Sequence, residues 1–212
     1  MSWSKSRSDK GRRAYHHGNL PDELVRAALE LIAEKGPSGF TMAEAARAAG
    51  VSPAAPYRHF RDREDLMAEV ARRGFDRLAE ALETAWEDGT PNPVSAFERV
   101  GRAYLKFARE NPADYAVMFE AGLPSDTSPE LSRANEKAFS VLRRASEILC
   151  QEAPADQRPP ALMVSLHIWS VSHGIAALFS RGDAARRKLP MAPEELLEAA
   201  ILIYLRGLGI RI

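Results

Sequence analysis

The sequence predicts an all-α fold in which three helices near the N-terminus precede a longer helical bundle. Apolar residues recur every three or four positions along most of the chain, which is the spacing of one helix face. Gly or Pro stands in each break between these segments, and we see no alternating Val, Ile and Thr runs of the kind that predict strands. Because 45% of the 212 residues are hydrophobic, the chain can bury a core, and disorder is not expected.

The ends of the first two helices are marked by residue type. A helix is expected from about Pro21 to Lys35, since Pro suits the first helical position and Gly36 suits the residue after the last turn. A second, shorter helix begins after Thr41, where Thr41 and Glu44 match a capping box.

A third short helix is expected directly after the second. Gly50 ends the second helix, and Ser52 is expected to cap the third with Pro53 at its first position. This third helix should run through Tyr57 and His59.

Longer helices make up the rest of the chain. Asp62 is expected to cap a connecting helix from Arg63 to about Trp86. Further helices follow near residues 94–109, 112–121, 129–152, 160–181 and 193–208. The segment 161–180 lacks Asp, Glu, Lys and Arg and is long enough to cross a bilayer. Its His and Ser side chains would be unsatisfied in hydrocarbon, so a helix buried in a bundle is favoured over a membrane span.

The two short helices and the corner between them match a helix-turn-helix. Small residues, Ala45, Ala46 and Ala49, precede the corner at Gly50, and Val51 follows it. Small side chains let the next helix cross closely, and Gly tolerates the turn conformation. The helix after the corner would then project outward, where it can enter the major groove of DNA.

The run from Ser52 to Phe60, Ser-Pro-Ala-Ala-Pro-Tyr-Arg-His-Phe, with the Arg-Asp-Arg-Glu-Asp-Leu that follows it, resembles the tetracycline-repressor (TetR) family. The resemblance spans Asn19 to about Val70. It implies a helix-turn-helix DNA-binding domain over 19–66, behind a basic flexible arm over 1–18. Pro56 departs from the larger apolar residue common at that position in the family, and an irregular start to the third helix is therefore expected.

The resemblance implies contacts to DNA for particular residues of this domain. Phosphate contacts are implied for Thr41, Tyr57, His59 and Arg63, and base contacts for Ala54, Ala55 and Arg58, with Ser52 beside them as the expected cap. Physical chemistry agrees with most of these roles, since a helix start attracts phosphate, Tyr and His can donate hydrogen bonds to it, and Arg can pair with guanine. A solvated surface charge is the alternative for Arg58, and core packing is favoured for Phe60.

The arm carries positive charge. Residues 1–63 hold 11 Lys and Arg against 7 Asp and Glu, whereas the remainder holds 18 against 22. Arg12 and Arg13 could therefore enter the minor groove of a duplex. His16 and His17 are adjacent but lack the further ligands of a zinc site, so no metal is expected there.

Residues 67–212 resemble the family's variable ligand-binding and dimerisation domain, and Trp169, His173 and Gly174 match a Trp-His-Gly signature of one branch. A small-molecule effector that is partly apolar is expected among Tyr104, Phe107, Tyr115, Met118, Phe119, Phe139, Trp169 and His173. A plain apolar core is the alternative for the aromatic residues, and a structural hydrogen bond is favoured for His173. The resemblance places a homodimer interface in the helices near 160–181 and 193–208.

The sequence therefore predicts a ligand-responsive DNA-binding transcriptional regulator, a repressor that binds a palindromic operator as a dimer. A helical adaptor that binds only protein is the alternative, but it would not explain the basic arm. An enzyme is not expected, because no catalytic elbow, metal-binding His pair, P-loop or dinucleotide fingerprint is present, and no cofactor is expected for the same reason. The single cysteine, Cys150, and the hydrophilic stretch after Met1 favour the cytoplasm, without association with a membrane.

Overall fold

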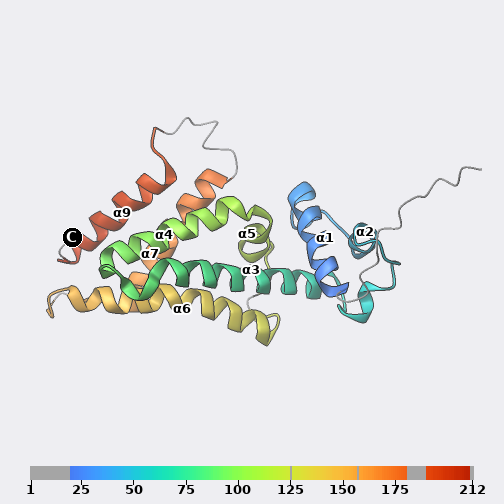
Figure 1. Cartoon of the computed structure of the whole chain (residues 1–212), viewed down its shortest axis with the longest axis horizontal. Helices are drawn as coiled ribbons and strands as arrows, with labels where there is room; N and C mark the ends of the chain where they lie inside the picture. The colour runs from blue at the N-terminus through green and yellow to red at the C-terminus, as the bar shows by residue number, and fades with distance from the viewer. Residues whose placement is uncertain (1–19, 125, 157, 181–189, 211–212) are drawn as a thin grey trace, which may run out of the picture.

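The computed structural model describes residues 20–124, 126–156, 158–180 and 190–210, and every regular element within these ranges is a helix, as the sequence predicts. The elements in chain order are α1 (Leu20–Lys35), α2 (Met42–Ala48), η1 (Pro56–Arg58), α3 (Arg63–Trp86), η2 (Glu87–Gly89), α4 (Pro93–Glu110), α5 (Pro112–Phe119), α6 (Pro129–Glu152), α7 (Ala161–Ser180) and α9 (Pro193–Gly207) (Figure 1).

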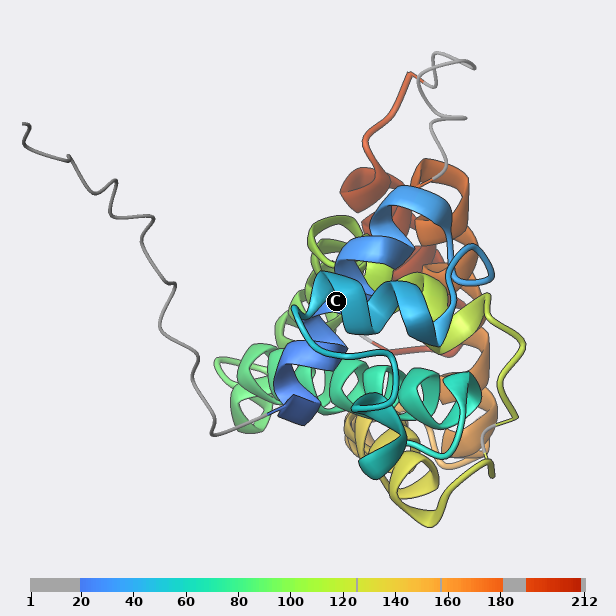
Figure 2. The ribbon, with the colours of Figure 1, turned by 90° about the vertical axis from the view of Figure 1, so that its right-hand side faces the viewer.

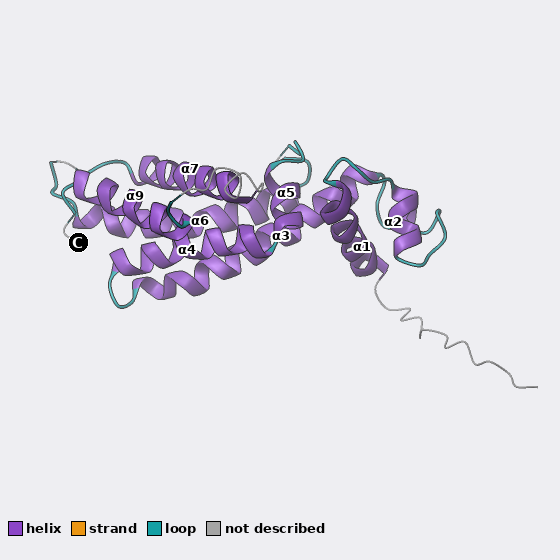
Figure 3. Ribbon diagram, turned by 90° about the horizontal axis from the view of Figure 1, so that it is seen from above, coloured by secondary structure: helices purple, strands orange, loops and turns teal. Residues whose placement is uncertain are grey.

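The molecule has a small head and a longer body that share one helix. Helices α1 and α2 form the head with the N-terminal end of α3 (Figures 1 and 3). In the body α4, α5 and α6 pack along the rest of α3, α7 packs on α4 and α6, and α9 packs on α4 and α7. Figure 2 looks onto the head, where the segment after α2 crosses in front of the body. Helix α3 passes the boundary expected between residues 66 and 67 without a break.

Local sequence explains where the body helices begin. Pro stands at the start of α5, α6 and α9, as predicted, and α4 also begins at a proline, Pro93, one residue before the expected start. The Asn92 side chain accepts a hydrogen bond from the Ser95 N–H, and the Ser128 hydroxyl accepts one from the Leu131 N–H. These caps satisfy backbone donors that the first turn of a helix leaves without partners.

The third helix of the head differs from the expectation. It is a 3-10 turn over Pro56–Arg58, with Ala55 at the cap position and no side-chain cap, so Ser52 does not cap it. Pro56 has no N–H to donate to the carbonyl of Ser52. The Ala55 N–H donates to that carbonyl instead (N···O 3.0 Å), and the His59 N–H donates to the Pro56 carbonyl (2.9 Å). These hydrogen bonds join residues three positions apart, as in a 3-10 helix, instead of four apart as in an α-helix.

One continuous core links the head to the body. Buried residues of α3 face the head at Leu66 and Val70 and the body at Leu78 and Leu82, and all belong to the same apolar cluster. Cys150 is also buried in this cluster as a small core residue, and burial raises the pKa of its thiol.

Candidate DNA-binding surface and ligand cavity

The corner after α2 is built on Gly50. This residue has φ +72°, in the left-handed region that favours glycine. The Gly50 N–H donates to the Arg47 carbonyl (3.1 Å), and the Val51 N–H donates to the Ala46 carbonyl (2.9 Å). This pair of bonds is a Schellman motif, which ends α2 and turns the chain sharply.

The segment after the corner has a buried base and an exposed face. Pro56 and Phe60 are buried, as expected for Phe60, whereas Arg58 and His59 are exposed and the Tyr57 side chain is 57% exposed. Ser52 and Ala54 are also exposed, and Ala55 is half-buried. The structure therefore leaves most of the side chains expected to contact DNA exposed on this segment of the head.

The start of α2 carries the predicted capping box. The Glu44 N–H donates to the Thr41 hydroxyl oxygen (3.3 Å), and the Thr41 N–H donates to the Glu44 carboxylate (2.9 Å). Lys35 donates to the same carboxylate (2.7 Å), and with the Thr41 bonds this lowers the pKa of Glu44 to about 2. A phosphate near Thr41 would therefore approach the start of α2 where the Glu44 carboxylate is already paired with Lys35.

Arg63 has contacts within the head. Its Nε donates to the Phe40 carbonyl (2.9 Å), a second donor reaches the Pro37 carbonyl, and the guanidinium lies 4.7 Å from the centre of the Phe40 ring. Arg63 therefore ties the start of α3 to the segment between α1 and α2. This role in positioning the head was not expected from the sequence.

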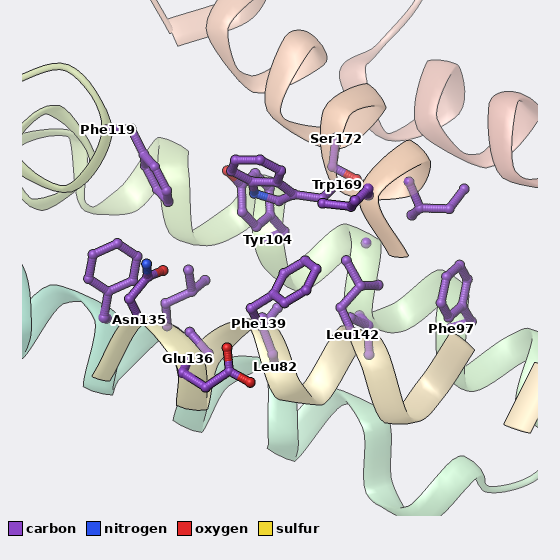
Figure 4. Close-up of a pocket in the computed structure, with 17 residues that line it drawn as sticks. Leu82, Phe97, Tyr104, Phe119, Asn135, Glu136, Phe139, Leu142, Trp169 and Ser172 are labelled. Atoms are coloured by element: carbon purple, nitrogen blue, oxygen red, sulfur yellow. The ribbon is translucent and has the colours of Figure 1, made fainter. Parts of the chain in front are cut away.

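A cavity of about 250 Å³ lies in the body between α3, α4, α6 and α7, with Phe119 of α5 at one end. Figure 4 shows Phe139 and Trp169 facing each other across it, with Tyr104 behind Trp169. The lining is Phe75, Leu78, Leu82, Phe97, Val100, Gly101, Tyr104, Phe119, Asn135, Glu136, Ala138, Phe139, Leu142, Leu166, Ile168, Trp169 and Ser172. Most of this surface is apolar.

The cavity brings together half of the side chains expected to bind an effector. Tyr104, Phe119, Phe139 and Trp169 line it. Met118 lines a smaller cavity of about 140 Å³ that shares Phe119 and Trp169. Tyr115 and His173 are absent from the lining and lie behind Tyr104, and Phe107 faces a separate hollow with Lys106 and Glu110.

A hydrogen-bonded cluster stands behind the cavity wall. Nδ1 of His173 lies 2.9 Å from the hydroxyl oxygen of Tyr104 and 2.8 Å from that of Tyr115. Burial lowers the pKa of His173 and raises the pKa of Tyr104. Burial thus favours the neutral forms of His173 and Tyr104, and the hydrogen bonds within the cluster agree with the structural bond favoured for His173.

Sequence reasoning missed the contribution of α3 to the cavity and, apart from Phe139, that of α6. Phe75, Leu78 and Leu82 form an apolar stripe at helical spacing, which indicates a buried face but not a hollow beside it. Asn135 and Glu136 also line the cavity. Two adjacent polar residues on a helix give no signal that one rim of a cavity lies there.

One face of α7 and α9 is apolar yet uncovered. The exposed large side chains here are Leu162, Met163, Leu166, Val171, Leu178 and Ile203, and Ile203 is 74% exposed. The His167 ring Nδ1 lies 3.0 Å from the Tyr204 hydroxyl oxygen, which ties α7 to α9. A Cβ atom added at Gly174 would meet no atom within 4 Å.

Helix α7 also has the length and composition of a membrane span over Ala161–Phe179, with 33% of that window buried. Its buried residues contact α4, α6 and α9, as in a core helix of a bundle. Such a helix by itself is weak evidence for a span.

Several expectations fall on residues that the structure does not describe. Arg12, Arg13, His16 and His17 lie outside the described residues. Among residues that are described, no three His, Cys, Asp or Glu side chains are grouped so that they could hold a metal ion.

Both halves of the chain match family models. Residues 24–70 match the model of bacterial regulatory proteins of the tetR family, and residues 97–204 match the tetracyclin repressor-like C-terminal domain. An uncharacterized HTH-type transcriptional regulator of Bacillus subtilis, YobS, is 26% identical over 87% of this chain and 90% of that protein. The HTH-type transcriptional regulator BetI of Rhizobium meliloti is 34% identical over 49% of this chain and 52% of that protein.

Solved structures share the fold. A protein of unknown function from Rhodococcus sp. RHA1 is 30% identical, covers 93% of this chain and 99% of its own, and has a TM-score of 0.77. The TetR family regulator PfmR from Thermus thermophilus is 24% identical, with coverage of 88% and 99% and a TM-score of 0.67. With family models matched in the head and in the body, the chain belongs to the TetR family of DNA-binding transcriptional regulators, which are not enzymes.

Proposed function

We propose that the protein is a repressor that binds a palindromic operator as a homodimer and releases it when an effector occupies the cavity. The observation that carries this proposal is the surface after the corner of the head. Tyr57, Arg58 and His59 are exposed there over a base of Pro56 and Phe60. A short segment presented in this way suits insertion into the major groove.

Roles in DNA binding follow from side-chain chemistry and from the family. Arg58 would pair with guanine, and the methyl groups of Ala54 and Ala55 would contact thymine methyls. Tyr57 and His59 would donate hydrogen bonds to phosphates. These roles place the discrimination between sequences on Arg58.

The other predicted contacts surround this surface. Thr41 and Ser52 are exposed on the head and would reach phosphates, while Arg12 and Arg13 would follow the minor groove. Arg63 is assigned a positioning role, since its donors already hold the carbonyls of the head. Operator binding places the protein in the cytoplasm, where the DNA is.

The homodimer would form through α7 and α9. Their uncovered apolar side chains exceed what a solvent-facing helix pair ordinarily shows, and the open space at Gly174 admits a second helix. A twofold dimer would present two heads to half-sites separated by about one helical turn, roughly 34 Å, or a multiple of it.

The test is binding to the duplex upstream of the protein's own gene, measured by fluorescence anisotropy at several salt concentrations. Arg58→Ala should reduce the preference for that sequence over a scrambled duplex, and Tyr57→Phe should weaken binding to both duplexes alike. Equal effects of both variants on every sequence would contradict the assigned roles.

A helical adaptor that binds only protein is the competing function. It predicts no duplex binding and no dependence of affinity on salt, whereas phosphate contacts make affinity fall steeply as salt rises. The same titration therefore decides between the two functions.

A further inference from the structure

The cavity has a chemical character that limits its occupant. Glu136 is the only charged residue in its lining within the described part of the chain, and none of these lining residues is Lys or Arg. The Glu136 carboxylate already pairs with Arg143 (2.8 Å), and its side chain is 59% exposed at the rim. A ligand carboxylate or phosphate inside would be buried without a partner, which is strongly unfavourable. A ligand cation would fare no better, because Glu136 lies at the exposed rim and is already neutralised by Arg143, so the cavity suits an uncharged occupant.

The volume of the cavity limits the size of the molecule that can occupy it. An apolar cavity of about 150 Å³ accepts benzene, so the 250 Å³ measured here suits a molecule of about ten non-hydrogen atoms. Aromatic rings of Phe119, Phe139 and Trp169 surround this space. Flat or flexible apolar groups would pack well against them.

Tyr104, Asn135, Trp169 and Ser172 all bring hydrogen-bond donors to the lining, and the Tyr104 hydroxyl is the one linked to the half-buried His173. Tyr104 and Tyr115 both approach the same ring atom, Nδ1 of His173. In one tautomer Nδ1 has a single lone pair, and in the other it has a single proton to donate. In either case one hydrogen bond to Tyr115, the shorter contact at 2.8 Å, satisfies the imidazole.

The Tyr104 hydroxyl proton can therefore turn away without leaving the imidazole unsatisfied. Tyr104 is the member of this pair that lines the cavity, whereas Tyr115 does not. Because the wall around it is apolar, a ligand oxygen placed here would gain a hydrogen bond in a site sheltered from water.

From this geometry we propose that the cavity binds a neutral molecule of about ten non-hydrogen atoms that carries one acceptor oxygen, and that Tyr104 determines this specificity by donating its hydroxyl proton to that oxygen. Tyr115 keeps His173 in place when Tyr104 turns to the ligand. The assignment of ligand class rests on the effector site of the proposed function.

The test is isothermal titration calorimetry of the full chain with three probes: propiophenone, a neutral ketone; n-propylbenzene, which lacks the oxygen; and 3-phenylpropanoate, which adds a charge. The ketone is expected to bind more tightly than the hydrocarbon, and the carboxylate more weakly than either. Tyr104→Phe should weaken ketone binding about fivefold to tenfold and leave hydrocarbon binding unchanged. Tyr115→Phe removes the bond that keeps His173 satisfied, so it should weaken ketone binding less than Tyr104→Phe does and leave hydrocarbon binding unchanged.

Several results would overturn the proposal: no binding of the ketone, tighter binding of the carboxylate, equal losses for ketone and hydrocarbon in Tyr104→Phe, or a loss in Tyr115→Phe as large as in Tyr104→Phe. Circular dichroism verifies that both variants fold, and Leu142→Trp, which narrows the cavity, should weaken the ketone and the hydrocarbon together. Duplex binding is measured separately. Ketone binding without any change in DNA affinity would refute the response to an effector while leaving the ligand assignment intact.

Discussion

Replacing Gly50 by Ala measures how much the stability of the head depends on having glycine at a position with positive φ. A Cβ atom added there would meet no atom within 4 Å, so steric overlap with the rest of the protein adds nothing. The backbone, however, has φ +72°, where an L-residue with a Cβ loses roughly 1–2 kcal/mol relative to Gly. We expect Gly50→Ala to lower the free energy of unfolding by that amount, which corresponds to roughly 2–8 °C in Tm for a chain of this size.

The assay is urea denaturation followed by far-UV circular dichroism, with two further variants as references. Gly50→Asn should lose less than Gly50→Ala, because Asn enters the left-handed region more readily. Gly207→Ala adds a Cβ to a position of α9 with equally open surroundings but without positive φ, so it should be neutral or slightly stabilising. A loss in Gly207→Ala as large as in Gly50→Ala would show that backbone conformation is not the cause.

Three other changes test the helix cap, the dimer face and the ion pair between the exposed Arg77 and the buried Asp114. The pKa of Glu44 is lowered to about 2, so the contribution of its carboxylate to stability is present above about pH 4.5 and is lost as pH falls toward 2. The difference in unfolding free energy between the wild type and Glu44→Gln should therefore shrink over that pH range. A constant difference would contradict the assigned cap. Ile203→Asp should shift the protein from dimer to monomer in analytical ultracentrifugation, and an unchanged sedimentation coefficient would exclude α9 from the interface. Asp114 is 6% exposed beside Arg77, and burial raises the pKa of its carboxyl group. Arg77→Met leaves the buried carboxylate without its partner, so it should destabilise the protein by roughly 1–3 kcal/mol more than Asp114→Asn near neutral pH. This excess loss should diminish as pH falls and the carboxyl group becomes protonated. Equal losses for the two variants at every pH would refute this.

Much of the helical framework could be predicted because its ends are encoded locally. Thr41 with Glu44, Asp62, and Pro129 after Ser128 each mark a helix start through backbone hydrogen bonds within a few residues. The third helix of the head could not be predicted from such marks. Pro56 closes its segment as a 3-10 turn, because the missing N–H outweighs the favourable placement of Ser52 and Pro53.

The cavity was only half predictable for a different reason. Helix periodicity assigns an apolar face, but it cannot say whether neighbouring faces meet tightly or leave a space. Phe107 and Tyr104 both lie on buried parts of α4, yet only Tyr104 faces the cavity. Phe75 of α3 faces it as well, because α3 packs closely against α6. Such arrangements depend on contacts between distant segments.

Helix α3 is one unbroken helix that joins the cavity to the head, and a tilt at its cavity end would carry the head with it. It contributes Leu82 to the cavity wall and Arg63 to the anchor of the DNA-binding surface, and no proline interrupts the helix between them. At a rise of about 1.5 Å per residue these positions are roughly 28 Å apart, so a tilt of about 5° at the cavity would move the far end by about 2.5 Å. Each protomer of a dimer would make this movement, and two heads set for successive grooves would lose their spacing together. Spin labels on the two heads would report that change in separation when a probe fills the cavity, and an unchanged separation would exclude such a tilt.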